Sequence, residues 1–237
     1  MHQIFKTTKE LSDDLLGLFF PNLCLGCGQP LIRGEEVICS ICHFHLPKTY
    51  FHNDPENPLN RVFWGRVNLE AVTAFLYFQK GSMVQQLLHQ LKYKDRQEIG
   101  VRIGKWYGQE LCLVDPFRDA ELIIPVPLHP KKLRKRGYNQ SQAFAEGLSA
   151  VMKAGTETGC LYRKVDSSTQ TRKARYNRWE NVENIFAVSH PEKIRGRHIL
   201  LVDDVITTGA TLEACAQVLL EIQGVKVSVA TIAYAST

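Results

Sequence analysis

The stretch Ile199-Leu200-Leu201-Val202-Asp203-Asp204-Val205-Ile206-Thr207-Thr208-Gly209-Ala210-Thr211 carries the strongest structural signal in the chain. It opens with four apolar residues in a row, as expected for a strand buried in a parallel sheet. Two carboxylates follow at the end of that strand, which is where open α/β sheets bind their ligands. A hydroxyl-rich loop then leads into a helical pattern, and the first backbone N–H groups of a helix can hold a phosphate. Gly209 would allow the backbone to approach such an anion closely.

The two acids, Asp203 and Asp204, would repel a phosphate but suit the hydroxyls of a sugar, with a divalent cation nearby. A phosphorylated ribose therefore satisfies both halves of the stretch. Each feature also has a purely structural explanation, because Asp-Asp can form a turn and Thr211 can cap a helix. Their combination directly after a buried strand favours a sugar-phosphate site.

Apolar runs alternate with helical patterns along most of the chain, which predicts an α/β fold with a parallel sheet and helices on both faces. We expect strands over residues 71–78, 122–126, 160–163, 185–188, 199–202 and 226–233. We expect helices over residues 82–92, 98–111, 141–152 and 211–223.

The 237 residues suffice for one full domain and a small accessory one. We predict a short amphipathic helix (residues 5–20) and a small finger within residues 1–48, a linker over 49–68, and the α/β domain over 69–237. The linker is predicted from its prolines, asparagines and histidines.

No apolar run approaches the ~18 residues of a membrane-spanning helix, so we expect no membrane insertion. The charged N-terminus does not resemble a secretion signal. Seven cysteines, an odd number, argue for a reducing compartment rather than a disulfide framework. These features predict a cytoplasmic protein.

Four of the seven cysteines form two C-x-x-C pairs, Cys24, Cys27, Cys39 and Cys42. This spacing predicts one structural zinc ion in a closed tetrahedral site. The alternative is four buried or redox-active cysteines, and His43 and His45 are substitute ligands. Cys112, Cys160 and Cys215 lie in apolar patterns and are predicted to be core residues.

The stretch from residue 199 to 211 resembles the phosphoribosyl-pyrophosphate (PRPP) motif of type I phosphoribosyltransferases. The whole chain resembles the ComF family of competence-associated phosphoribosyltransferase-like proteins, which also begin with a four-cysteine finger. The matching motifs are Leu91-Lys92-Tyr93-Lys94, Pro125-Val126-Pro127, Arg136-Gly137-Tyr138-Asn139-Gln140 and Arg178-x-x-Asn181-Val182 with Phe186.

The resemblance implies that Mg²⁺ and PRPP bind here, with Asp203 and Asp204 as the catalytic candidates holding the ribose 2′- and 3′-hydroxyls. The loop from Thr207 to Thr211 would surround the 5′-phosphate, and the Lys92 to Lys94 segment would lie on the pyrophosphate side. The residues assigned to PRPP are Asp203, Asp204, Val205, Ile206, Thr207, Thr208, Gly209, Ala210, Thr211, Lys92, Tyr93, Lys94 and Arg136.

Residues 125–180 hold twelve Lys and Arg against four Asp and Glu, whereas the net charge of the chain is only +5. Three interpretations compete. The cations could close over the pyrophosphate of a bound ligand, they could bind single-stranded nucleic acid together with stacking aromatic rings, or they could form a solvated loop. The nucleic-acid candidates are Lys131, Lys132, Arg134, Lys135, Arg136 and Tyr138. A second group of cations lies over residues 172–178, interleaved with Tyr176 and followed by Trp179.

Two functions follow from these features. One is a phosphoribosyltransferase that displaces pyrophosphate from C1 of the ribose, with Lys92, Lys94 and Arg136 as candidate pyrophosphate contacts. The other is a non-catalytic module that senses PRPP and binds single-stranded DNA. The resemblance implies a role in DNA uptake during natural competence, with a helicase-like competence ATPase as partner.

Overall fold

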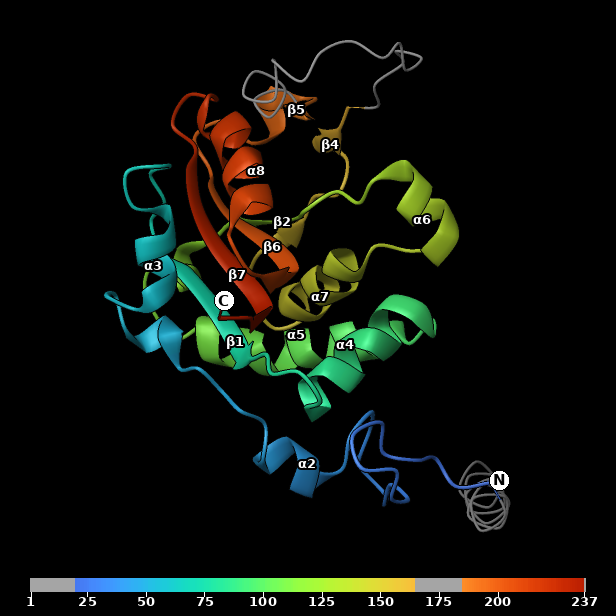
Figure 1. The fold of residues 1–237 in the computed structure, drawn as a ribbon. Helices are drawn as coiled ribbons and strands as arrows, with labels where there is room; N and C mark the ends of the chain where they lie inside the picture. The colour runs from blue at the N-terminus through green and yellow to red at the C-terminus, as the bar shows by residue number, and fades with distance from the viewer. Residues whose placement is uncertain (1–19, 165–184, 237) are drawn as a thin grey trace, which may run out of the picture. The chain divides into compact units, whose positions relative to one another are not determined.

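The computed structural model describes residues 20–164 and 185–236 (Figure 1). The chain divides into two compact units, Met1–Leu46 and Pro47–Thr237. The helix predicted over residues 5–20 and the cations predicted over 172–178 lie outside the described residues, apart from position 20. No helix in the described part of the chain is long and apolar enough to cross a membrane.

Within residues 20–46, the described part of the N-terminal unit, the chain forms tight turns and one short helix, α2 (Ser40–Phe44). The turn after the first C-x-x-C pair needs Gly28, whose φ is +78°, in the left-handed region. Glu35 ties the unit together, since its carboxylate accepts hydrogen bonds from the backbone N–H groups of Ile32 (3.0 Å) and Ser40 (2.7 Å). These bonds and the Ser40 hydroxyl lower the pKa of Glu35.

The C-terminal unit contains a five-stranded, all-parallel sheet in the order β1-β7-β6-β2-β3. Its strands are β1 (Val72–Tyr77), β2 (Leu122–Pro125), β3 (Gly155–Thr156), β6 (His198–Ile206) and β7 (Lys226–Tyr234). A separate antiparallel pair consists of β4 (Leu161–Arg163) and β5 (Phe186–Val188). The predicted parallel sheet is confirmed.

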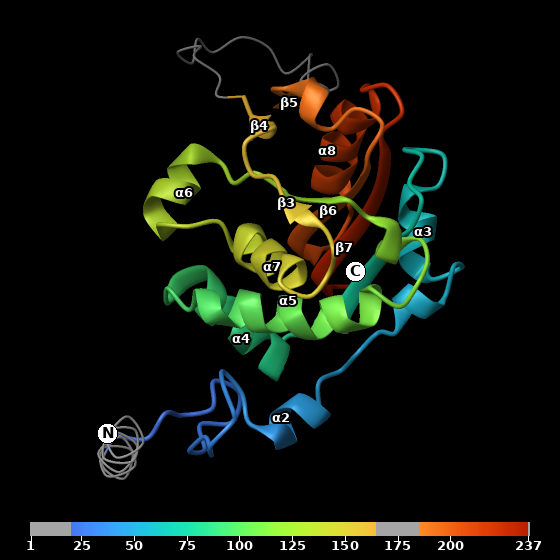
Figure 2. The ribbon, with the colours of Figure 1, turned by 180° about the vertical axis from the view of Figure 1, so that it is seen from behind.

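Helices cover both faces of the sheet (Figures 1 and 2). The helices are α3 (Pro58–Phe63), α4 (Met83–Tyr93), α5 (Gln97–Leu111), α6 (Pro130–Arg136), α7 (Gln140–Ser149) and α8 (Ala210–Leu220). Ile199 and Leu201 share one hydrophobic cluster with Leu212 of α8. On the other face, the hydroxyl of Thr73 lies 2.6 Å from that of Tyr107 on α5. Alternate residues of the strands thus face opposite helical layers.

Single turns of 3₁₀-helix at Phe51–Asn53, Phe117–Asp119 and Pro191–Lys193 complete the fold. Within the described residues, the helices and strands predicted after residue 70 appear within a few residues of their expected bounds, except that β6 runs on to Ile206 instead of ending at residue 202. The short elements β3, α3 and α6 were not predicted.

The segment predicted to be a linker, residues 49–68, folds onto the sheet and belongs to the C-terminal unit. Phe51, Leu59 and Phe63 are buried in the same hydrophobic cluster as the strands. Prolines and asparagines interrupt the apolar positions of the segment, so these three apolar residues leave no clear periodic signal. The linker prediction is therefore wrong for most of this segment.

This segment also covers the outer edge of β1. The side chain of Asn57 donates to the carbonyl of Val72 (3.0 Å), and that of Asn60 accepts from the N–H of the same residue (2.9 Å). Further along the edge, Thr49 binds the carbonyls of Ala74, through its hydroxyl, and Phe75, through its N–H. Side chains and one short stretch of backbone thus satisfy groups that an edge strand would otherwise expose.

Helices α5 and α7 approach each other closely through glycines. A Cβ atom added to Gly104 would lie 2.4 Å from the carbonyl oxygen of Phe144, and one added to Gly147 would lie 2.1 Å from the carbonyl oxygen of Val101. Both distances are far below van der Waals contact. The close packing places the first turn of α7 against the end of β6, where the candidate site lies.

Candidate functional site

The end of strand β6 carries the two predicted carboxylates. Asp203 pairs with Thr231 of β7, and the register continues to Ile206 opposite Tyr234, so both acids lie within the strand rather than in the loop after it. This placement fixes their backbones within the sheet. The residues from 205 to 212, together with Asp203, line a small cavity of about 50 Å³.

The loop from Thr207 to Gly209 leads from β6 into α8. Thr207, Thr208 and Thr211 are exposed, whereas the side chain of Ile206 is buried in the core. Gly209 precedes the first residue of α8 with a φ of +75°. The loop therefore presents hydroxyls and the N-terminus of an eleven-residue helix to solvent, an arrangement that suits a phosphate.

Helix α3 supports this loop from the side, a relationship that the sequence did not predict. A Cβ on Gly209 would lie 2.7 Å from the ring of Phe63, so only glycine fits there. Arg66 donates to the carbonyl oxygens of Thr208 (3.3 Å) and Val62 (3.0 Å) and forms an ion pair with Glu213 in the first turn of α8. These contacts support the loop on the side of α3.

The two carboxylates have different partners. Oδ1 of Asp203 accepts hydrogen bonds from the hydroxyl of Ser141 (2.8 Å) and from the N–H of Asp204 (2.8 Å). Oδ2 of Asp204 lies 2.9 Å from Nζ of Lys92, at the end of α4. Within the described residues, the other oxygen of each carboxylate has no hydrogen-bond or ion-pair partner. The pair therefore keeps two oxygens for a sugar hydroxyl or a cation.

Burial and the adjacent Asp204 charge raise the pKa of Asp203 to about 7, and its bonds to Ser141 and to the N–H of Asp204, together with the charge of Lys92, oppose that rise. Near neutral pH Asp203 is thus only partly ionised, which reduces the repulsion between the two adjacent carboxyl groups. Carboxylates with raised pKa values are frequent at functional sites.

The structure brings Lys92 to the predicted site but places its neighbours differently. Tyr93 and Lys94 are exposed at the end of α4, and neither contacts the acids. Arg136 reaches this region from α6, since its guanidinium lies over the ring of Tyr93 (5.2 Å) and donates to the side chain of Gln140 (2.7 Å).

The six nucleic-acid candidates divide into two groups. Lys131, Lys132, Arg134 and Lys135 are exposed on α6, a helix that has no buried residue. Arg136 and Tyr138 instead turn inward. The ring of Tyr138 is 9% exposed, and its hydroxyl donates to the carbonyl of Leu91. Burial raises the pKa of Tyr138 to about 12. This burial does not favour the predicted stacking of a base on Tyr138.

Ser141 is the residue at the site that the sequence did not single out. The sequence places it only at the start of a predicted helix, and the observed N-cap is Asn139, whose side chain accepts from the N–H of Ser141 (3.1 Å). The partner of Ser141, Asp203, lies far away in sequence. No local pattern reports such a contact.

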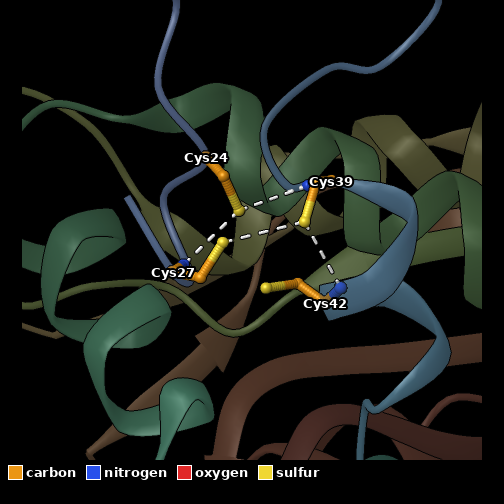
Figure 3. A group of neighbouring side chains, drawn as sticks. All are labelled: Cys24, Cys27, Cys39 and Cys42. Carbon is orange, nitrogen blue, oxygen red and sulfur yellow. Dashed lines mark hydrogen bonds between the residues drawn. The ribbon is translucent and has the colours of Figure 1, made fainter. Parts of the chain in front are cut away.

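The four predicted zinc ligands come together in the N-terminal unit (Figure 3). The sulfur atoms of Cys24, Cys27, Cys39 and Cys42 all lie within 4.8 Å of one another. Those of Cys27 and Cys39 are 3.8 Å apart, which is about the separation that a tetrahedral ion with bonds of ~2.3 Å imposes. Among the described residues no histidine belongs to the cluster.

The backbone of the finger favours thiolates. The sulfur of Cys24 accepts N–H bonds from Gly26 (3.4 Å), Cys27 (3.5 Å) and Cys39 (3.2 Å). Burial opposes ionisation of Cys24, but these N–H groups outweigh it and lower its pKa to about 6. Burial and the neighbouring sulfurs raise the pKa of Cys42. A divalent cation would offset that mutual repulsion, so the residues fit a four-thiolate metal.

The remaining cysteines are placed as follows. Cys160 and Cys215 are fully buried, as predicted for core residues. Cys112 is half-buried at the end of α5, and its sulfur donates to the carbonyl of Gln109 (3.4 Å). The core prediction for Cys112 is therefore wrong. The last residue of α5, Leu111, is buried, whereas Cys112 follows it as the C-cap and is partly open to solvent.

Comparison with known proteins agrees with this geometry. Residues 140–237 match the model of the phosphoribosyl transferase domain. The chain is 31% identical over 219 residues to DNA utilization protein YhgH of Escherichia coli O157:H7, covering 86% of this chain and 92% of that protein. It is 28% identical over 206 residues to competence protein ComFC of Bacillus subtilis, covering 84% and 78%.

A third relative is competence protein F of Haemophilus influenzae, 34% identical over 100 residues, or 42% of this chain and 44% of that protein. This chain belongs to the ComF family of phosphoribosyltransferase-like proteins. In this ComF-family chain the phosphoribosyl transferase match contains both carboxylates, Ser141 and the loop before α8. Lys92, Arg136 and the cysteine cluster precede the matched range.

Proposed function

We propose that this ComF-family protein binds PRPP with Mg²⁺ at the carboxyl end of β6 and acts in DNA uptake. The observation that carries the proposal is the Asp203–Asp204 pair, followed directly by the loop and helix N-terminus that suit a phosphate. A ligand with a phosphate next to a sugar diol matches both halves. PRPP is such a ligand.

Each part of the site has a distinct role in this proposal. The hydroxyls and N–H groups from Thr207 to Thr211 bind the 5′-phosphate. The uncommitted carboxylate oxygens of Asp203 and Asp204 accept the ribose 2′- and 3′-hydroxyls. Lys92 and Arg136 supply positive charge on the side of the pyrophosphate, with Lys94 as a further candidate.

The donor set near the acids also fits Mg²⁺, which prefers carboxylate oxygens together with the phosphates of its substrate. When bound, the ion would neutralise charge on the pyrophosphate. Asp203 and Asp204 are the residues that would lie beside it. Zn²⁺, by contrast, is proposed as a structural ion of the four-cysteine cluster.

If the protein is an enzyme, an acceptor nucleophile forms a bond to C1 of the ribose while the bond from C1 to the pyrophosphate oxygen breaks. The electron pair leaves with pyrophosphate, and the acceptor gives up its proton to solvent. The carboxylates hold the sugar through this step, and the cations stabilise the leaving group. Pyrophosphate release should be measured across a panel of bases and amines.

The central experiment is a calorimetric titration of PRPP with Mg²⁺ into the full-length chain. The double variant Asp203→Asn/Asp204→Asn should lose at least ~10-fold in affinity, because each substitution weakens charge-assisted hydrogen bonds to the diol. Asp115→Asn/Asp119→Asn removes the same charge from exposed positions and should bind like wild type. Equal affinity in all three proteins would overturn the site assignment.

A second candidate function is a non-catalytic PRPP sensor that binds single-stranded DNA. The four exposed cations of α6 favour it, because closely spaced charges bind a phosphate backbone. The relatives' names, which refer to DNA utilization and competence, support a DNA-related role. A helicase-like ATPase as partner and a cytoplasmic location complete the proposal.

Neutralising Lys131, Lys132, Arg134 and Lys135 together should weaken binding of a single-stranded oligonucleotide and flatten its salt dependence. Lys153, Lys164, Arg195 and Lys226 are also exposed and provide a control of equal charge. If both variants bind alike, α6 is not the nucleic-acid surface. PRPP binding without pyrophosphate release from any acceptor would favour the sensor over the enzyme.

A further inference from the structure

We propose that Tyr138 is a positioning residue that holds Lys92 beside Asp204. The segment Arg136–Ser141 would then fix where the lysine ammonium group and the two carboxylates lie relative to one another. This inference rests on the proposed PRPP site, because it explains how the cation of that site is kept in place. It also gives a different role to a tyrosine whose ring was expected to stack on nucleic-acid bases.

The first support is the end of helix α4. The last four carbonyls of a helix have no partner within it, so the final turn frays unless other groups bind them. The hydroxyl of Tyr138 donates to one of these carbonyls, that of Leu91. Lys92 is the next residue, and its ammonium group lies 2.9 Å from Asp204. Tyr138 thus caps the turn that carries Lys92.

The second support is the other neighbour of Lys92. The guanidinium of Arg136 lies over the ring of Tyr93, 5.2 Å from its centroid, and is itself held by the side chain of Gln140 at 2.7 Å. The residues before and after Lys92 are therefore both held from the same segment of the chain. A lysine side chain is flexible, and holding the turn that carries it leaves less conformational freedom to be lost when its ion pair forms.

The third support is that the same segment also reaches the acids. Asn139 anchors it to the end of β2, through a 2.9 Å bond to the carbonyl of Val126. Two residues later the hydroxyl of Ser141 binds Asp203 at 2.8 Å. One segment thus places the cation through Tyr138 and the carboxylate through Ser141. Hydrophobic packing of the segment alone would not require hydrogen bonds both to the turn that carries Lys92 and to Asp203.

The test compares Tyr138→Phe with a matched variant, Tyr107→Phe. Both substitutions keep a buried ring and remove one hydroxyl hydrogen bond, but the hydroxyl of Tyr107 binds Thr73 on β1, which β7 separates from β6 and its two acids. Loss of a buried hydrogen bond should weaken PRPP binding about three- to ten-fold in Tyr138→Phe. Tyr107→Phe should bind PRPP as wild type does.

A double-mutant cycle with Lys92→Met separates positioning from general stability. If Tyr138 acts through Lys92, then adding Tyr138→Phe to Lys92→Met should change PRPP affinity by less than about two-fold. A full additional loss in the Lys92→Met background would overturn the proposal, because Tyr138 would then act on binding by another route.

A ligand-free measurement keeps the inference separate from the proposed function. The ε-ammonium signal of Lys92 in the full-length chain, assigned by its loss in Lys92→Met, should be visible by NMR at low temperature, since the ion pair slows its exchange with water. It should broaden or vanish in Tyr138→Phe and persist in Tyr107→Phe. Persistence in Tyr138→Phe would refute the positioning role even if PRPP binds.

Failure of the proposed function gives a different result. A wild-type chain that does not bind PRPP refutes the proposed function, and the NMR result still decides the role of Tyr138.

Discussion

The ammonium nitrogen of Lys92 lies 2.9 Å from Oδ2 of Asp204, which joins the last turn of α4 to the end of β6. The contact puts one positive charge beside two adjacent carboxylates. Without it, the acids would have only hydrogen bonds to balance their repulsion. The ammonium group therefore lowers the pKa of Asp203, against the larger effects of burial and of the Asp204 charge.

Replacing Lys92 with methionine should raise the pKa of Asp203 further above its ordinary value. The ammonium charge lowers that pKa in the wild-type protein, whereas burial and Asp204 raise it to about 7. Carboxyl ¹³C NMR over a pH series would report the midpoint. Lys94→Met removes the same charge from an exposed position and serves as the control. An unchanged midpoint in Lys92→Met would show that the ion pair does not form in solution.

Replacing Asp203 with asparagine should change how stability depends on pH. The carboxyl titrates near 3.8 in the unfolded chain and at about 7 in the folded protein. Between these values the folded state binds more protons, so its stability falls as pH rises through this window. The asparagine variant lacks this loss, and its stability relative to wild type should increase from pH 4 to 7 and then level off. Urea unfolding at several pH values measures the difference, and a constant difference would contradict the prediction.

Removing metal should unfold the N-terminal finger. We expect about one zinc per chain, since four thiolates complete a tetrahedral shell, and chelation should remove the folded NMR signals of residues 20–46. Cys39→Ser should reproduce this loss, while Cys112→Ser, outside the cluster, should retain the metal. A metal-free preparation with the finger still folded would refute the zinc assignment.

Substituting Gly104 with alanine should destabilise the C-terminal unit by about 1–3 kcal/mol, as overpacking of a close helix contact does. The added methyl would lie 2.4 Å from a backbone carbonyl of α7, which cannot move aside like a side chain. Gly155→Ala is the control, because its Cβ would meet only a leucine methyl at 3.9 Å. Urea denaturation of both variants gives the comparison, and equal stability would mean that α5 and α7 are less tightly packed than described.

Gly209→Ala should disturb the loop before α8 for two reasons. Its φ of +75° is costly for alanine, and the methyl would lie 2.7 Å from the ring of Phe63. We expect a loss of PRPP affinity that Phe63→Leu relieves in part, since that change removes the clash but leaves the backbone strain. Complete recovery, or none, would show that only one of the two causes operates.

Apolar runs were enough to predict the parallel sheet, because β6 and β7 are buried on both faces and therefore read as continuous hydrophobic segments. The continuation of β6 through Asp203 and Asp204 could not be predicted from apolar runs. It depends on backbone pairing with Thr231 to Tyr234, and long-range pairing leaves no mark in the local sequence. Sheet order likewise depends on contacts between distant segments.

The carboxylates, the phosphate loop and the cysteine pairs were accessible from sequence because each is a short motif with fixed spacing. Ser141, Phe63 and Arg66 were not, because each meets its partner only after the chain has folded. Charge patterning identified the basic run but not its division into four exposed cations and an inward-facing Arg136 and Tyr138. Gly137, whose φ of +83° ends α6, turns the chain so that Tyr138 reaches the end of α4.

The polar side chains that cover the outer edge of β1 affect whether two copies of this protein can pair through their sheet edges. With Asn57, Asn60 and Thr49 bound to that strand, a second chain finds few open backbone groups there to pair with. The opposite border of the sheet ends in β3, a strand of two residues. Both borders are thus poor templates for cross-chain β-pairing, which protects the folded protein against aggregation.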